Sequence, residues 1–415
     1  MIASFLNSLE DLGLWPSAVS KALIHLLLKP SGDRRPIGLI DGLIKLWEGC
    51  RKPLVQRWRE GMNRPYDASR RGRRITEALW RQALQDEVAQ ATGLCSITAL
   101  LDLTKAFEHV PLDKAWANGV RTGFPLKILR LALEAFAMAR HLTFQGVTAP
   151  EGVTTLTAIV AGTSFAPDVL FLVLHEPVDQ IRTLWPTVWP SMVMDDLALQ
   201  IVATQSEVQE LALKVLDTII SMLEDLGGIV SRGRAGTPGG KTVMVTASAP
   251  LAHDLQEGAA ARGVAIVSGA RNLGHDYTAG GPAAEFRDTT ASRLAAMQRL
   301  QERLRHLGWG RRAQEQMLYG SLAPKGAFAT DSFGMADAEL RILDQAGHAS
   351  LGPTTGRSAY ARLRTSRGLP SEGPALKPAI AWCTQAFEPY DDRVHEHMGI
   401  AWKAAVTAVG LANDP

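Results

Sequence analysis

The feature that most constrains this chain is a set of aspartates placed inside apolar, strand-like segments. Residues 96–103 (SITALLDL) form an apolar run that contains Asp102 near its end. Residues 191–200 (SMVMDDLALQ) place Asp195 and Asp196 between two short apolar arms, a pattern typical of a hairpin. Because side chains alternate along a strand, one of this pair faces the same side as Asp102 if the strands are neighbours.

Strand-like and helical segments alternate on both sides of these aspartates. The pattern predicts strands over 20–29, 96–103 and 241–248, and helices over 42–59, from about 74, and over 205–227. In the clearest of the helices, Ser206 and Gln209 are the predicted capping box. Beyond about 285 the chain becomes helical and basic, with linker-like stretches near 349–357 and 367–377. The sequence therefore predicts an α+β class, with a mixed α/β core near 91–282 and helices around it.

The composition fits a folded protein of 415 residues with two or three subdomains. With 46% hydrophobic residues the chain can bury a core, which excludes wholesale disorder. No uncharged apolar run of about 18 residues predicts a membrane helix, and Glu10 and Asp11 interrupt the apolar start that a secretory signal would need. The three cysteines, Cys50, Cys95 and Cys383, form no disulfide or zinc pattern. An intracellular, reducing compartment is expected.

The net charge of +2 conceals two basic stretches. Between Arg51 and Arg81 there are ten basic residues against three acidic ones, and between Arg293 and Lys325 there are seven against two. This distribution is expected if a polyanion is held from two sides above a carboxylate site. Two solvated helical faces would give the same charge pattern, so charge alone leaves both interpretations open.

The aspartates have two interpretations of their own. Carboxylates on adjacent strands are the hard oxygen ligands that Mg²⁺ prefers, with phosphate oxygens completing the coordination. Two such ions about 4 Å apart suit in-line displacement at phosphorus. Alternatively, Asp195 and Asp196 form an ordinary exposed turn, for which Asp-Asp is a common composition.

Six segments between about residues 20 and 280 decide between these interpretations by their order and spacing. They are Lys29-Pro30 with Arg34-Arg-Pro-Ile37, Asp102-Leu-Thr-Lys-Ala-Phe-Glu-His-Val110, Ile159-Val-Ala-Gly162 with Ala166-Pro167, Val193-Met-Asp-Asp-Leu197, Leu226-Gly-Gly with Lys241-Thr242, and Asn272-Leu-Gly274. Together they resemble the motifs of reverse transcriptases, in the non-LTR (LINE-type) retrotransposon branch.

The resemblance implies a right-hand polymerase fold. Its palm would be an antiparallel sheet backed by helices, and its thumb would be helical. The expected division is fingers over 1–90 and 113–150, palm over 91–112 and 151–282, thumb over 283–348, and a C-terminal extension without an assigned fold over 349–415.

The resemblance also implies an activity. Asp102, Asp195 and Asp196 are the catalytic residues and the ligands of two Mg²⁺ ions, with Mn²⁺ as an alternative. The implied reaction is RNA-directed DNA synthesis, in which a primer 3′-hydroxyl attacks a dNTP. The implied partners are dNTPs and an RNA or DNA template with its primer. A membrane is not among them, and the sequence assigns no oligomeric state.

Five further residues take nucleotide-binding roles from the resemblance. Phe107 lies beneath the incoming sugar, where its bulk excludes a 2′-hydroxyl; Lys29 and Arg35 meet the triphosphate. Lys241 lies near the leaving pyrophosphate, and Gly162 allows close backbone approach to a nucleotide. Each residue also has a plainer alternative. Phe107 would be a core aromatic, and Lys29 and Arg35 would be surface charges. Lys241 would be a strand-edge lysine, and Gly162 an ordinary turn glycine.

Departures from the family pattern leave other functions open. Ala161, Glu108, Met194 and Ala166 replace residues that the family usually has. None of these positions is a metal ligand, but a catalytically inactive retroelement relic that only binds nucleic acid is the alternative. An RNA-synthesising polymerase is a third candidate, against which Phe107 argues. A nucleus is where such an element would work, although no separate import signal is recognisable.

Overall fold

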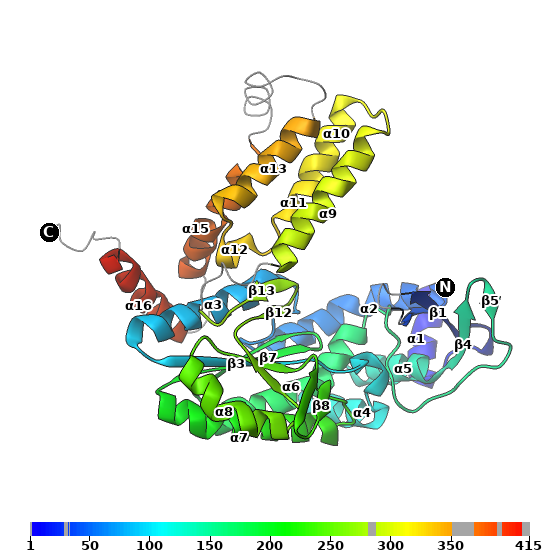
Figure 1. Cartoon of the computed structure of the whole chain (residues 1–415). Coiled ribbons are helices and arrows are strands. Elements are labelled where there is room, and N and C mark those ends of the chain that lie inside the picture. Colours follow the sequence, from blue (N-terminus) through cyan, green and yellow to red (C-terminus); the bar gives the residue numbers. More distant parts are fainter. Residues whose placement is uncertain are drawn as a thin grey trace.

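A five-stranded sheet, called the central sheet below, runs through the middle of the molecule (Figure 1). The computed structural model describes residues 2–28, 32, 34–280, 288–350, 369–387 and 392–408. The strands lie in the order β11-β10-β3-β7-β6, and all neighbours are antiparallel except β10 and β11. Their bounds are β3 Cys95–Leu101, β6 Val188–Val193, β7 Asp196–Ala203, β10 Val243–Val245 and β11 Ala265–Val267.

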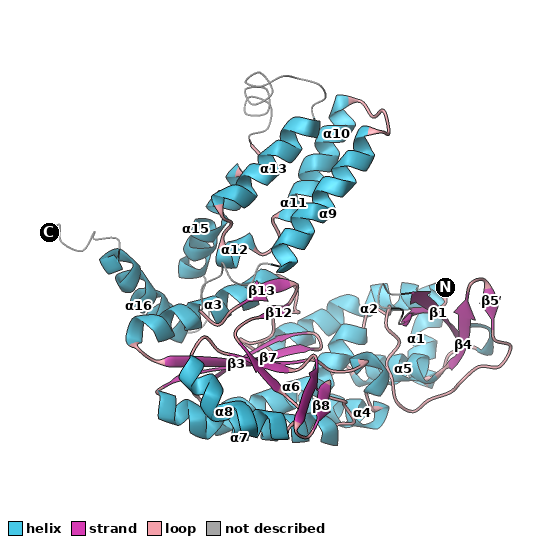
Figure 2. Ribbon diagram, in the orientation of Figure 1, coloured by secondary structure: helices cyan, strands magenta, loops and turns pink. Residues whose placement is uncertain are grey.

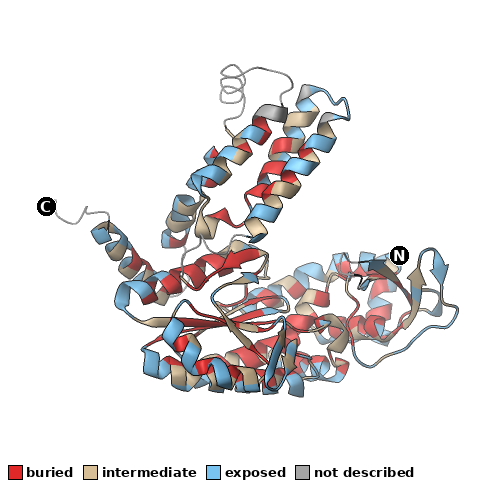
Figure 3. Cartoon of the chain, in the orientation of Figure 1, coloured by how far each residue is buried: buried red, intermediate tan, exposed pale blue. Residues whose placement is uncertain are grey.

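Helices cover both faces of the central sheet (Figure 2). Helix α3 (Ile75–Thr92) packs on one face, and α6 (Ala166–Leu184) and α7 (Gln205–Asp225) pack on the other, beside α8 (Ala249–Ala261). The alternation along β3 explains this sandwich. Ile97, Ala99 and Leu101 enter the main hydrophobic core, whereas Ser96 on the opposite face hydrogen-bonds to α3. Figure 3 shows the resulting buried layer along the sheet.

A second, smaller sheet lies near the N-terminus. Its order is β2-β1-β4-β5, with β1 and β4 parallel and the other pairs antiparallel. The strands are β1 Lys21–Leu28, β2 Arg34–Leu39, β4 Ala139–Phe144 and β5 Val147–Thr148, and the helices of this region are α1 Ile2–Leu12, α2 Gly42–Gly61, α4 Leu112–Thr122 and α5 Leu126–Ala137. We call this the N-terminal sheet.

Two hairpins and a group of helices complete the chain. The hairpins pair β8 Arg232–Arg234 with β9 Thr237–Gly240, and β12 Ala270–Asn272 with β13 His275–Tyr277. The helices are α9 Asp288–Arg305, α10 Arg311–Met317, α11 Ala323–Gly326, α12 Thr330–Phe333, α13 Asp337–Ser350, α15 Glu372–Phe387 and α16 Asp392–Ala408, with a π-helical turn at Leu318–Leu322. Leu294, Met297 and Leu343 form part of their own small core.

The mixed α/β class predicted from the sequence is confirmed. The predicted hairpin at 191–200 is also present, and its arms extend to Val188 and Ala203. The capping box was placed two residues too late: Thr204 and Glu207 form it, because α7 begins at Gln205, directly after its N-cap Thr204. The linker predicted near 367–377 is also wrong in part, since α15 begins at Glu372. The stretch 351–357 lies outside the described residues.

The division into fingers, palm, thumb and extension stays a prediction. No helix in the described part of the chain is both long and apolar enough to span a membrane. The cysteines Cys50, Cys95 and Cys383 are all free.

Candidate active site

The Asp195–Asp196 hairpin closes tightly at one end of the central sheet. Val193 pairs with Asp196, so only Met194 and Asp195 form the turn. Met194 has φ of +57°, a left-handed conformation that two-residue hairpin turns usually give to glycine or asparagine. Its backbone N–H donates to the Ser69 hydroxyl at 2.6 Å. The turn therefore holds Asp195 outside the ladder while Asp196 begins β7.

Asp102 lies at the same end of the sheet, on the neighbouring strand. Leu101 pairs with Leu197, so continuing this antiparallel register by one residue places Asp102 opposite Asp196. The backbone of Asp102 is fixed on both sides, because its N–H donates to Thr242 Oγ1 at 3.2 Å and its carbonyl accepts from Ser231 N at 2.8 Å. Its side chain is 28% exposed.

The three carboxylates influence one another electrostatically. Burial raises the pKa of Asp195, and the negative charges of Asp102 and Glu108 raise it further. Burial likewise raises the pKa of Asp196 to about 6, with added repulsion from Asp195 and Asp102. Like charges gathered at partly buried positions create a negative potential that a bound cation would relieve.

Lys241 supplies the nearest positive charge at this site. Its Nζ lies 3.3 Å from Asp102 Oδ1, and its side chain is 75% exposed. It also interacts favourably with Asp195 and Asp196. Within the described ranges, no group of three or more His, Cys, Asp or Glu side chains forms a ready-made metal cage.

The segment around Gly162 connects the carboxylate site to the N-terminal sheet. The carbonyl of Phe107, a half-buried residue packed on the main core, accepts from Ile159 N at 2.8 Å. Further along this segment, Ala161 O accepts from Gly38 N of β2 at 3.0 Å. Gly162 is exposed and has φ of +109°, and an added Cβ would lie 2.8 Å from Gly38 O.

The two predicted triphosphate contacts are less well placed by the structure. Arg35 is exposed on β2, three residues before Gly38, and in the part of the chain that is described no ion pair joins it to the aspartates. Lys29 lies outside the described residues. The structure thus brings Asp102, Asp195, Asp196 and Lys241 together, while the roles of all the predicted site residues stay predictions.

The structural need for glycine at position 162 can be tested by measuring stability. Replacing Gly162 by alanine is expected to lower the free energy of unfolding by about 2–3 kcal/mol, because strained φ and a collision with β2 add together. Gly72→Ala is the matched control, since Gly72 also has positive φ (+84°) but no atom of the described residues within 4 Å of its added Cβ. Urea denaturation of both variants gives the comparison. Equal losses of unfolding free energy in the two variants would show that the contact with β2 does not contribute.

The Arg-rich segment lies beside the carboxylate hairpin, but much of its charge is used internally. Asp67 forms a parallel bridge with Met192 of β6, so this segment extends the edge of the central sheet. Four arginines of the predicted basic stretch form ion pairs within the fold: Arg51–Glu10, Arg59–Asp67, Arg64–Asp179 and Arg73–Glu77. The stretch therefore offers a polyanion fewer charges than its composition implies.

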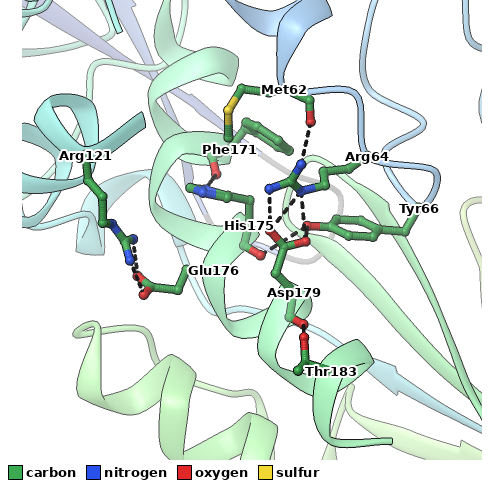
Figure 4. A network of polar contacts seen from close by, with 9 residues as sticks. All are labelled: Met62, Arg64, Tyr66, Arg121, Phe171, His175, Glu176, Asp179 and Thr183. Atoms are coloured by element: carbon green, nitrogen blue, oxygen red, sulfur yellow. Dashed lines mark hydrogen bonds and ion pairs between the residues drawn. The ribbon is translucent and has the colours of Figure 1, made fainter. Parts of the chain in front are cut away.

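Figure 4 shows how one of these pairs anchors the segment to α6. Arg64 and the Tyr66 hydroxyl both donate to the carboxylate of Asp179, at 2.8 Å each. The Tyr66 hydroxyl also donates to the carbonyl of His175 at 3.1 Å. Burial and the negative charge of Asp179 raise the pKa of Tyr66 well above its usual range, so its hydroxyl stays protonated as a donor.

Sequence reasoning missed Glu48, which supports the Gly162 segment from α2. This buried carboxylate accepts from Ser164 N at 3.0 Å, and its burial raises its pKa. The sequence offers no signal for it, since it reads as a helical surface charge. Glu108 was noted only as a departure from the family pattern, yet it is close enough to affect Asp195.

Comparisons with known proteins give little independent information. No protein-family model matches the chain, and neither does any curated protein. Two similar solved structures are an apo telomerase from Candida tropicalis truncated from its C-terminal domain, and a telomerase from Candida albicans in complex with a TWJ fragment of telomeric RNA. They are 10% and 12% identical, each with a TM-score of 0.44, over 67% and 95% of this chain. The chain spans 58% of the first telomerase and 70% of the second. Likeness at this level settles neither fold family nor activity, so both rest on the residues of this chain.

Proposed function

We propose that the protein is an RNA-directed DNA polymerase of the reverse-transcriptase type, with its LINE-type branch inferred from the motifs alone. The observation that carries the proposal is the convergence of Asp102, Asp195 and Asp196 at one end of the central sheet, with Lys241 beside them. These are the positions that the motif order assigns to catalysis. If Asp195 and Asp196 served only to form the hairpin turn, a third carboxylate from another strand would not be needed beside them.

The proposed metal site rests on the chemistry of these three side chains. Carboxylate oxygens are suitable ligands for Mg²⁺, which is commonly held by one or two carboxylates together with substrate phosphates and water. Asp102 and Asp195 would hold the ions, with Asp196 beside them. Once bound, the ions would lower the pKa of the primer 3′-hydroxyl and neutralise charge on the pyrophosphate.

The remaining residues would position the nucleotide. Lys241 is exposed enough to leave Asp102 and donate to a phosphate. Phe107 would form the floor under the sugar, and Gly162, with no side chain, would let a base or sugar approach the backbone. Arg35 and Lys29 would approach the triphosphate from the N-terminal sheet. The proposed partners are dNTPs and a primed RNA or DNA template, and the proposed compartment is the nucleus.

Primer extension on poly(rA) with an oligo(dT) primer tests the proposal. The wild-type protein is expected to incorporate dTTP in the presence of Mg²⁺ or Mn²⁺ and to reject UTP, because Phe107 leaves no room for a 2′-hydroxyl. Asp195→Asn is expected to abolish the incorporation. Binding of the primed template should weaken steeply as salt rises, since backbone contacts dominate it.

The other outcomes of this assay identify other functions. Tight template binding without extension by either protein would make the chain an inactive nucleic-acid-binding relic. A preference for UTP over dTTP would indicate an RNA-synthesising polymerase. Incorporation that survives Asp195→Asn would show that the proposed carboxylate site is not the catalytic one.

A further inference from the structure

A separate cavity of about 60 Å³ lies along the edge strand β6. One ordered water needs roughly 10–15 Å³ of such space, so the cavity has room for several waters or for one tetrahedral oxyanion. Its walls come from β6, β7, α3, α6, α16 and the segment 65–68. The residues that carry the argument are Arg73, Arg81, Arg182, Arg393, Gln85 and Trp189.

The lining of the cavity carries more positive than negative charge. Four arginines line it, against the two carboxylates Asp67 and Glu77. Both carboxylates already have ion-pair partners, Asp67 with Arg59 at 2.6 Å and Glu77 with Arg73 at 3.2 Å. Arg59 is itself outside the lining, so its charge adds to the neutralisation of Asp67. Among the described residues of the lining, guanidinium groups outnumber carboxylates, and such a partly enclosed site favours an anion, especially one that accepts several hydrogen bonds.

Gln85 adds a second, independent requirement. Gln85 lines the cavity and is only 2% exposed, and among the described residues its Oε1 has no hydrogen-bond partner. A buried acceptor without a partner is costly, so the occupant of the cavity should also carry a donor. Hydrogen phosphate has both features, since its oxygens accept from arginine and its P–OH group donates. Sulfate has no proton to donate.

The cavity is distinct from the carboxylate site. Its lining includes Ser191 of β6 but none of Asp102, Asp195 and Asp196. An anion in the cavity would not touch the aspartates. It would instead bind between Arg182 of α6 and Arg393 of α16. The guanidinium carbon of Arg393 lies over the Trp189 ring, 4.3 Å from its centroid.

We propose that this cavity binds a phosphate group in its hydrogen-phosphate form. Two sources share this chemistry, namely free inorganic phosphate and the 5′-terminal phosphate of a nucleic-acid strand. The proposal rests on the lining residues alone and does not depend on the polymerase activity proposed above.

Calorimetric titration of the full chain with sodium phosphate and with sodium sulfate, at constant ionic strength and near-neutral pH, tests the site. Wild type should bind phosphate more tightly than sulfate. Arg182→Gln should weaken phosphate binding by at least about tenfold, as expected for loss of one charge-assisted hydrogen bond in a buried site. Arg341→Gln is the matched control, because Arg341 is exposed on α13 outside the lining, and it should bind as wild type does.

Gln85→Leu gives a second variant that keeps the test decisive if Arg182→Gln does not fold. It removes the acceptor, so the preference for phosphate over sulfate should disappear. A 5′-phosphorylated oligonucleotide and its 5′-hydroxyl counterpart identify the source: competition with inorganic phosphate by the former alone would assign the site to a strand terminus, and no competition would assign it to the free anion. No binding by wild type, or equal effects of Arg182→Gln and Arg341→Gln, would mean water or an adventitious ion only and would overturn the proposal.

Discussion

Replacing Asp102 by asparagine is expected to reduce dTTP incorporation by about a thousandfold or more, while the fold remains intact. The fold should survive because the contacts that fix residue 102 come from its backbone N–H and carbonyl, which asparagine keeps. The activity should be lost because an amide has no negative charge with which to hold a divalent ion, and such an ion contributes several kcal/mol to the transition state. Single-turnover primer extension measures the effect.

A readout other than activity separates loss of the metal from a general defect. Mn²⁺ should raise the melting temperature of wild type, because an ion that binds only the folded state stabilises it by mass action. Asp102→Asn should lose most of this increase, whereas Asp225→Asn, an exposed carboxylate at the end of α7, should keep it. If Asp102→Asn retained both incorporation and the Mn²⁺ effect, Asp102 would not be a metal ligand and the proposed site would fail.

The parts of this site that the sequence predicted are those with a local pattern. An apolar run ending near Asp102 predicts a strand because β-branched and apolar residues favour a buried pleat, and β3 lies where it was expected. The Asp-Asp pair between apolar arms likewise predicted the β6–β7 hairpin. The register between β3 and β7 does not follow from this pattern, because both strands are buried on both faces and a slip by one residue would still bury apolar side chains.

The parts that could not be predicted depend on contacts between distant segments. Asp67 pairs with Met192 across more than a hundred residues, and no periodicity in the Arg-rich segment indicates this bridge. For the same reason, the charge count left Arg59 either in contact with a polyanion or on a solvated helical face, whereas the structure buries it against Asp67 and the ring of Phe171. A charged residue in sequence carries no mark of its future partner, so its role appears only in the fold.

A buried polar cluster under α3 is the clearest case of such a long-range arrangement. Asp86 of α3 is only 2% exposed, and its Oδ1 accepts from Ser96 Oγ at 2.6 Å and from Gln200 Nε2 at 2.7 Å. Thr98 and Tyr277 share a hydrogen bond of 2.8 Å nearby. This cluster ties α3 to β3, β7 and β13 on the face opposite the main core. Burial raises the pKa of Asp86 to about 7, despite these hydrogen bonds.

The stability of the protein should therefore depend on the protonation of Asp86. Its pKa is about 7 in the folded state and 3.8 ordinarily, so between these values the folded protein holds a proton that the unfolded chain has released. The stabilisation from this proton is fully present below about pH 4 and is lost as the pH rises through about 7. When the pH is lowered from 8 to 5, the unfolding free energy of wild type should rise by about 2–3 kcal/mol relative to that of Asp86→Asn, at 1.36 kcal/mol per pKa unit.

Urea denaturation across this pH range, on wild type and Asp86→Asn, measures the difference. Asparagine keeps the acceptor oxygen for Ser96 and Gln200 but cannot titrate, so its stability should lack this part of the pH dependence. Asp113→Asn is the control, because Asp113 is exposed in the first turn of α4 and its replacement should leave the slope of wild type unchanged. Parallel curves for wild type and Asp86→Asn would show that Asp86 is ionised in the folded protein at pH 5. Its hydrogen bonds would then outweigh the cost of burying its charge.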